Sequence, residues 1–210
     1  MEMGCGSGMT CWRRLRDWQA CEAWFQIHLA LLDRLRGSDR LDLSRAAVDS
    51  GSVRAVGGGE KTGPNSTDRA RPGSKHHVIS DAHGVPLAYT STGANAHDVT
   101  RLLPLADAVP PIAGKPGHPQ RRPRAVFADR AYDSKWHRAE LRRRGIRPWL
   151  AARNTEHGSG LGVYRWVIER TIGCLHKFRR LRVRFERRAD IHEAFLALGC
   201  IVICYNALTR

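Results

Sequence analysis

The stretch AAVDSGSV at residues 46–53 decides the expected fold, because it carries the apolar pattern of a buried strand with a carboxylate inside it. Asp49 stands between Ala46-Ala47-Val48 and Val53, where burial favours an apolar side chain. An unpaired charge is costly to bury, although a single acidic residue near a strand is more often a turn or cap residue. The stretch predicts a strand over residues 46–56, and the significance of Asp49 depends on the rest of the chain.

The segments that follow alternate between strand and helix patterns. Two strands are predicted around the turn-forming DAHG at residues 81–84, and the apolar AVFA at 125–128 predicts a short buried strand that ends on Asp129. The predicted strands are 46–56, 75–80, 86–92, 125–128 and 146–151; the predicted helices are 12–36, 97–108, 133–144, 163–181 and one opened by the capping pattern Asp190-x-x-Glu193. Residues 57–74 and 110–123 are predicted loops. Such a series indicates an α/β fold with a mixed sheet and helices packed on its faces.

The charge balance indicates a polyanionic partner. The 210 residues contain 35 Lys and Arg against 20 Asp and Glu, a net charge of +15, and such a field favours nucleic acid or an anionic surface. The chain lacks the G-x-x-x-x-G-K-[ST] order of a phosphate-cradling loop, which excludes the usual NTPase motif. The apolar stretch 194–204 is shorter than the roughly 20 residues of a membrane span, so we expect a buried helix with Cys200 and Cys204 in the core. No Cys-x-x-Cys pair is present, so a zinc site is not expected and a reducing cytoplasm fits.

Three carboxylates interrupt apolar patterns in different predicted elements. Asp49 lies in the first strand, Asp129 ends the strand 125–128, and Glu169 lies in a helix between Ile168 and Ile172. Carboxylates can share a buried site when divalent metals neutralise them, and two Mg²⁺ ions about 4 Å apart catalyse phosphodiester chemistry. Convergence of the three in space is an expectation that the fold must test.

Helical geometry supports a role for Glu169. At about 100° per residue, Arg165 lies about 40° and His176 about 20° from Glu169 on the helix, whereas Lys177 lies about 80° away. A carboxylate flanked by basic groups at the rim of a buried face suits metal binding beside a phosphate. An ordinary surface ion pair between Arg165 and Glu169 explains the same spacing equally well.

At these residues the chain resembles the bacterial insertion-sequence transposases of the DDE type, specifically the insertion-sequence-five group. The likeness runs in consistent order from about Thr10 to the C-terminus. The matching segments are DSGSVRA (49–55), TGPN (62–65), RPGSKHH (71–77), TGANAHD (92–98), ADRAYDS (128–134) and YRWVIERT (164–171).

The resemblance implies a ribonuclease H-like fold with a mixed five-stranded sheet, with Asp49 on the first strand, Asp129 on the fourth and Glu169 on a later helix. It implies that these three are catalytic and bind two Mg²⁺ ions, for which Mn²⁺ can substitute. The implied reaction is nicking at element ends and joining of the 3′-hydroxyl to target DNA. The implied partners are terminal inverted repeats and target DNA, bound by a homodimer at the nucleoid in the bacterial cytoplasm, without a membrane.

The resemblance also implies DNA-positioning residues. The family's Tyr-Arg-Glu-Lys motif maps onto Tyr164, Arg165 and Glu169, but the lysine position holds His176, and Lys177 is one place late. Arg130, next to Asp129, belongs to the same expected surface. A neutral histidine donates to a phosphate only in the right tautomer.

Two regions are expected: residues 1–40 as a helical remnant of an N-terminal DNA-binding region, and residues 41–210 as the catalytic domain. The short first region suggests a truncated copy or the downstream product of a split reading frame. The alternatives to an active transposase are therefore a DNA-binding remnant that cannot transpose, a ribonuclease H-like nuclease without strand transfer and, more remotely, a basic ribosome-associated protein.

Basic residues gather beside two of the carboxylates and predict a DNA backbone surface. Trp136, Trp149 and Trp166 are expected in the core rather than as base-stacking platforms. His76 and His77 are expected to pack inside the sheet, with an approach to the site as the alternative. The basic residues are Arg121, Arg122, Arg124, Arg130, Lys135, Arg138, Arg142, Arg143, Arg144 and Arg147, then Lys177, Arg179, Arg180, Arg182, Arg184, Arg187 and Arg188.

Overall fold

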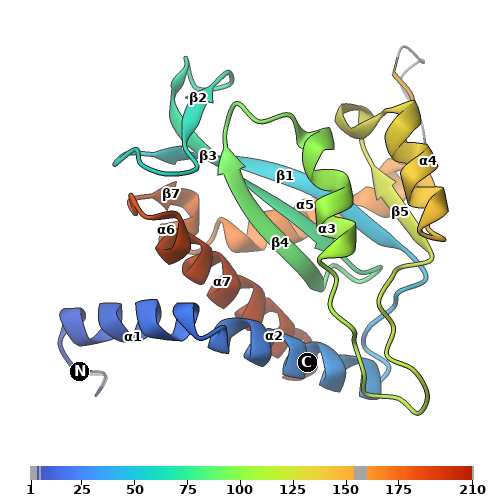
Figure 1. The fold of residues 1–210 in the computed structure, drawn as a ribbon, viewed down its shortest axis with the longest axis horizontal. Helices are drawn as coiled ribbons and strands as arrows, with labels where there is room; N and C mark the ends of the chain where they lie inside the picture. Colours follow the sequence, from blue (N-terminus) through green and yellow to red (C-terminus); the bar gives the residue numbers. More distant parts are fainter. Residues whose placement is uncertain (1–3, 5, 154–159, 210) are drawn as a thin grey trace.

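The computed structural model describes residues 4, 6–153 and 160–209 (Figure 1). Its strands are β1 (Ala46–Ala55), β2 (Gly63–Asn65), β3 (Arg71–Ser80), β4 (Pro86–Gly93), β5 (Ala125–Ala128), β6 (Arg147–Leu150) and β7 (Val183–Arg184). Its α-helices are α1 (Gly8–Ala20), α2 (Ala23–Gly37), α3 (Leu102–Asp107), α4 (Lys135–Arg143), α5 (Gly162–Leu175), α6 (Arg179–Arg182) and α7 (Ala189–Thr209), with 3-10 turns η1 (Asp98–Arg101) and η2 (Arg130–Tyr132).

The sheet is mixed, as the sequence predicts, and β1 lies at its centre. Strands β4, β3 and β1 pair antiparallel, and β1, β5 and β6 pair parallel. The five predicted strands are these five, and the short strands β2 and β7 add to them at β3 and β1. The first strand is central and the fourth predicted strand, β5, lies beside it, which is the ribonuclease H-like arrangement that the resemblance implies.

Alternate residues of the central strands face opposite layers of helices. Ala47 and Val78 pack with the α5 and α7 side chains, whereas Val48 and Ile79 pack in the cluster that contains the α3 residues. In Figure 1, α3 lies in front of the strands and α5 passes behind them. Because side chains alternate along a strand, Asp49 faces α5, like Ala47, and Ser50 faces α3, like Val48.

The N-terminal helices pack on the C-terminal one. The predicted helical region 12–36 is two helices that separate at Glu22, whose φ is 57°. Leu32 and Leu35 of α2 are fully buried in the main core, and both α2 and α1 contact α7, which crosses them at an angle (Figure 1). Helix α7 is long and apolar enough to cross a membrane by length and composition, but Cys200 and Cys204 are buried, as expected of a core helix.

Three local predictions are wrong. The helix predicted over 163–181 ends at Leu175, because Phe178 is extended and the turn lets Leu175 and Leu181 both pack against Gly199 of α7. The predicted loop 57–74 contains β2 and the first residues of β3, since Gly and Pro are tolerated at a sheet edge. Glu193 does not cap α7; its carboxylate accepts hydrogen bonds from Ser91 and Lys61.

Candidate active site

Asp49 and Asp129 meet where two parallel strands separate. The pairing of β1 with β5 is limited to Ala46↔Val126 and Ala47↔Phe127, so both aspartates lie just beyond the last paired residues. Asp129 follows β5 directly and caps η2, its Oδ1 accepting from the Ala131 N–H at 2.9 Å. The carboxyl ends of parallel strands are a usual place for a ligand crevice.

Glu169 and Arg165 of α5 complete the cluster from the facing layer. Arg165 Nη2 lies 3.3 Å from Asp49 Oδ2, 3.7 Å from Glu169 Oε1 and 4.0 Å from Asp129 Oδ2. The three carboxylates, from three elements, therefore surround one guanidinium group. The Arg165–Glu169 pair expected on the helix is present, with Arg165 17% and Glu169 60% exposed; it differs from a lone surface pair because Arg165 also approaches Asp49 and Asp129.

Burial and like charges act on Asp49. Its side chain is 18% exposed, and burial raises its pKa, with the charges of Asp129 and Glu169 adding to the effect. The Ser50 N–H, which donates to Asp49 Oδ1 at 2.8 Å, and the Arg165 guanidinium oppose that rise. Positive charge near Asp49 therefore favours its ionised form.

The donor set of this cluster fits a divalent metal. Carboxylate oxygens are the ligands that Mg²⁺ prefers, and Asp49, Asp129 and Glu169 each direct an oxygen towards the Arg165 guanidinium, a cation. Among the described residues, no three His, Cys, Asp or Glu groups already stand as a metal cluster. In this arrangement the Arg165 guanidinium stands among the three carboxylates.

Two further predicted positioning residues, Tyr164 and Arg130, are next to Arg165 and Asp129 in the chain. The Tyr164 ring lies 5.0 Å from that of Phe127 and 5.2 Å from the Arg45 guanidinium, measured between ring centroids and to the guanidinium carbon. Tyr164 is 40% exposed and adjoins Arg165. Arg130 opens η2 directly after Asp129, and its carbonyl accepts from Arg153 Nε.

His176 and Lys177 follow the last turn of α5. His176 ends α5 and packs over Gly51 of β1, where a Cβ would come within 2.9 Å of its Cε1. Burial lowers the pKa of His176, which favours the neutral imidazole, and its direct use on a phosphate stays a prediction. Lys177 is not brought to the carboxylates; it lines a separate surface cavity with Arg170 and Val202.

Several expectations about neighbouring residues are wrong. Trp136, Trp149 and Trp166 are 61%, 46% and 51% exposed rather than in the core. Arg184, expected among the DNA contacts, is fully buried and donates to backbone carbonyls and Ser74 Oγ. His76 and His77 are fully buried, in agreement with the prediction that they pack inside the sheet.

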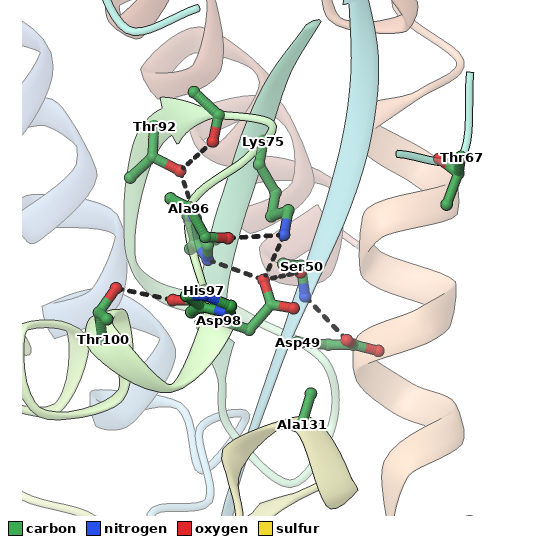
Figure 2. A network of polar contacts seen from close by, with 12 residues as sticks. Asp49, Ser50, Thr67, Lys75, Thr92, Ala96, His97, Asp98, Thr100 and Ala131 are labelled. Atoms are coloured by element: carbon green, nitrogen blue, oxygen red, sulfur yellow. Dashed lines mark hydrogen bonds and ion pairs between the residues drawn. The ribbon is translucent and has the colours of Figure 1, made fainter. Parts of the chain in front are cut away.

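Sequence reasoning missed the residues on the α3 side of β1. Asp98 of η1 accepts from Ser50 Oγ at 2.7 Å and Lys75 Nζ at 2.9 Å (Figure 2). Buried Tyr132 has a raised pKa, first from burial and then from the charges of Asp98, Asp49 and Asp129. Asp98 ends the segment TGANAHD at 92–98, which matches the transposase family but carried no predicted role. Nothing in the sequence indicates its contact with Ser50.

Comparisons with known proteins agree with this geometry. The chain is 65% identical over 174 residues to "Putative transposase for insertion sequence element IS402" of Burkholderia cepacia, a match that covers 83% of this chain and 82% of the relative. It is 31% identical over 124 residues to a transposase for insertion sequence element IS1106 of Neisseria meningitidis serogroup B, covering 54% of this chain and 39% of the relative. A solved structure of a simian T-cell lymphotropic virus intasome with the PP2A regulatory subunit B56 gamma is similar at 16% identity and a TM-score of 0.42, covering 74% of this chain and about half (48%) of that one; the strand topology, not this likeness, carries the fold.

A family model described as the transposase DDE domain matches residues 40–207. That span includes all three carboxylates and every strand of the sheet. Membership in the insertion-sequence-five group stays a prediction. The chain belongs to the DDE transposases of insertion elements.

Proposed function

We propose that Asp49, Asp129 and Glu169 are the catalytic acids of this transposase, binding two Mg²⁺ or Mn²⁺ ions for nicking of element ends and joining of the 3′-hydroxyl to target DNA. The supporting observation is the approach of one oxygen from each acid to the same guanidinium nitrogen, within 4.0 Å. These acids come from β1, the end of β5 and α5, so their meeting results from the whole fold.

Bound metal supplies a Lewis acid for the attacking and leaving oxygens of the phosphodiester. Asp49 and Asp129 hold the charge of the site on the strand side, and Glu169 does so on the α5 side. Arg165 has a different task in each state: it balances the carboxylates before metal binds, and its guanidinium binds a phosphate oxygen afterwards, a contact that suits its planar set of donors.

The DNA backbone lies on the exposed basic residues. Some predicted contacts are engaged in ion pairs, such as Arg138 with Asp133 and Arg144 with Asp107 and Glu140, and serve the fold first. The net charge of +15 leaves ample positive surface for phosphates. The exposed residues proposed as phosphate contacts are Arg121, Arg122, Arg124, Lys135, Arg142, Arg147, Arg179, Arg182 and Arg187. Action as a homodimer is part of the proposal.

The test incubates the purified chain with labelled DNA from the element's ends and a target plasmid in Mg²⁺. Asp129→Asn, which keeps size and removes the charge, is the matched variant. We expect nicked and joined products from the wild type and none from the variant. Products from Asp129→Asn would sink the mechanism. Nicking without joining would favour a nuclease, and salt-sensitive binding without nicking would favour a DNA-binding remnant.

A further inference from the structure

A polar network lies on the face of β1 opposite the three acids. Figure 2 shows Asp98 between Ser50 and Lys75, with the Lys75 ammonium also directed to the Ala96 carbonyl. Asp98 Oδ1 accepts from Ser50 Oγ at 2.7 Å and from Lys75 Nζ at 2.9 Å, and Lys75 donates to Ala96 O at 2.9 Å. The network joins β1, β3 and the segment before η1.

Ser50 connects this network to Asp49. Ser50 faces the α3 side, where its hydroxyl donates to Asp98, while its N–H donates to Asp49 Oδ1 at 2.8 Å. Asp49 Oδ1 is thereby engaged, and Oδ2 is the oxygen that faces Arg165. Hydrogen bonds therefore link Lys75 to Asp98 and Asp98 to the Ser50 side chain, and the backbone N–H of the same serine binds the Asp49 carboxylate.

The strand needs such a tether here. On one side, residues 47–54 of β1 pair with β3. On the other side, pairing with β5 is confined to Ala46 and Ala47, and pairing with β7 to Arg54 and Ala55. Asp49 and Ser50 thus lie on an open edge, where the usual ladder on the second side does not hold the backbone.

The network is sheltered and its charge is balanced. The side chains of Asp98 and Lys75 are 21% and 13% exposed. The fully buried His77 has its Nδ1 3.8 Å from Asp98 Oδ1, and burial lowers its pKa to about 4, so Lys75 supplies the cation. Such sheltered pairs add little net stability, and a fixed geometry is their better-attested use.

We propose that Asp98 is a positioning residue that acts through Ser50 to hold Asp49, so that Oδ2 faces the other two acids. Lys75 balances the charge of Asp98 and, through its contact with the Ala96 carbonyl, fixes the 96–98 segment against β3. This inference rests on the proposed catalytic role of Asp49. Because a misplacement of about 1 Å can cost roughly a hundredfold in rate, the effect should appear in catalysis and not in DNA affinity.

The test compares Asp98→Ala, Ser50→Ala and the double variant in single-turnover cleavage at saturating DNA. Each single change should lower the rate by at least about tenfold and raise the Mg²⁺ concentration for half-maximal rate, with DNA affinity unchanged. Because Asp98 and Ser50 are proposed to act through the same contact, the cleavage rate of the double variant should be within about twofold of that of the slower single variant. Ser50→Thr, which keeps the hydroxyl, should restore the rate, and Ser52→Ala, an exposed change two residues along the strand, should behave as wild type.

Three results would overturn the proposal: wild-type rates in both alanine variants, losses that multiply in the double variant, or failure of Ser50→Thr to restore activity. If Asp98→Ala does not fold, the comparison of Ser50→Ala, which removes one hydroxyl, with Ser50→Thr, which keeps it, is sufficient to test the proposal. Asp49→Asn distinguishes failure of the proposed catalytic role of Asp49 from failure of the positioning role of Asp98. If Asp49→Asn stays active, the proposed function fails; if it is inactive while Ser50→Ala and Asp98→Ala are not, only the positioning role fails.

Discussion

At the scale of single residues, Arg165 is the group whose removal tells most about the site. Without its guanidinium, the three carboxylates repel one another with no cation among them, so binding of added metal should stabilise the folded protein more. We expect Arg165→Met to lower strand cleavage by about a hundredfold, an amount usual for a lost charge contact in the transition state. Without DNA, Mg²⁺ should raise the Tm of Arg165→Met more than that of wild type. Thermal unfolding with and without Mg²⁺ checks this, with exposed Arg142→Met as control; equal shifts would contradict it.

Gly51 is a second informative residue, because β1 and α5 approach each other there. An added Cβ would lie 2.8 Å from Ile172 Cγ2 and 2.9 Å from His176 Cε1. We expect Gly51→Ala to lower the free energy of unfolding by about 1–3 kcal/mol, as overpacking does. Combined with His176→Ala, the cost should be smaller than the sum of the two changes. Urea unfolding of the four proteins measures the coupling, and strict additivity would show that the histidine does not cause the crowding.

At the scale of elements, the contact between α2 and β4 makes folding sensitive to acid. His28 Nε2 lies 2.9 Å from the Pro86 carbonyl, and burial lowers the pKa of His28 to about 4 from the usual 6.5. Between these values the unfolded chain binds the proton and the folded chain does not, so stability falls as pH drops from 6.5 towards 4. From pH 7 to 5, wild type should lose about 2 kcal/mol more than His28→Gln. Urea titrations at both pH values test this; parallel losses would exclude His28.

Elements with strong periodicity were predictable, and those set by distant contacts were not. The apolar pattern around Asp49 predicted strand β1, whereas its two faces are known only from the structure. The break in α5 after Leu175 depends on Gly199, and the tie between Ser50 and Asp98 depends on how η1 returns to β1. Neither partner is near in sequence. The three acids became a specific set through family resemblance, since spacing alone left Glu169 compatible with a surface ion pair.

At the scale of the whole molecule, the charge of +15 predicts DNA binding that weakens steeply with salt. Two arginines two residues apart offer a matched comparison, because Arg182 is exposed and Arg184 is fully buried. Arg182→Gln should make the slope of log affinity against log salt shallower by about one unit. Arg184→Gln should leave the slope unchanged and lower Tm. Fluorescence anisotropy across a salt series measures the slope, and equal slopes for Arg182→Gln and wild type would remove Arg182 from the DNA surface.

The position of the Arg165 guanidinium among the three acids affects the stability of the protein in the absence of DNA and metal. Three carboxylates without a cation among them would repel one another, and this repulsion would weaken the folded state when no metal is bound. Arg165 supplies the positive charge from within the chain. We therefore expect the protein to stay folded in EDTA, so that the proposed metal would control activity separately from folding.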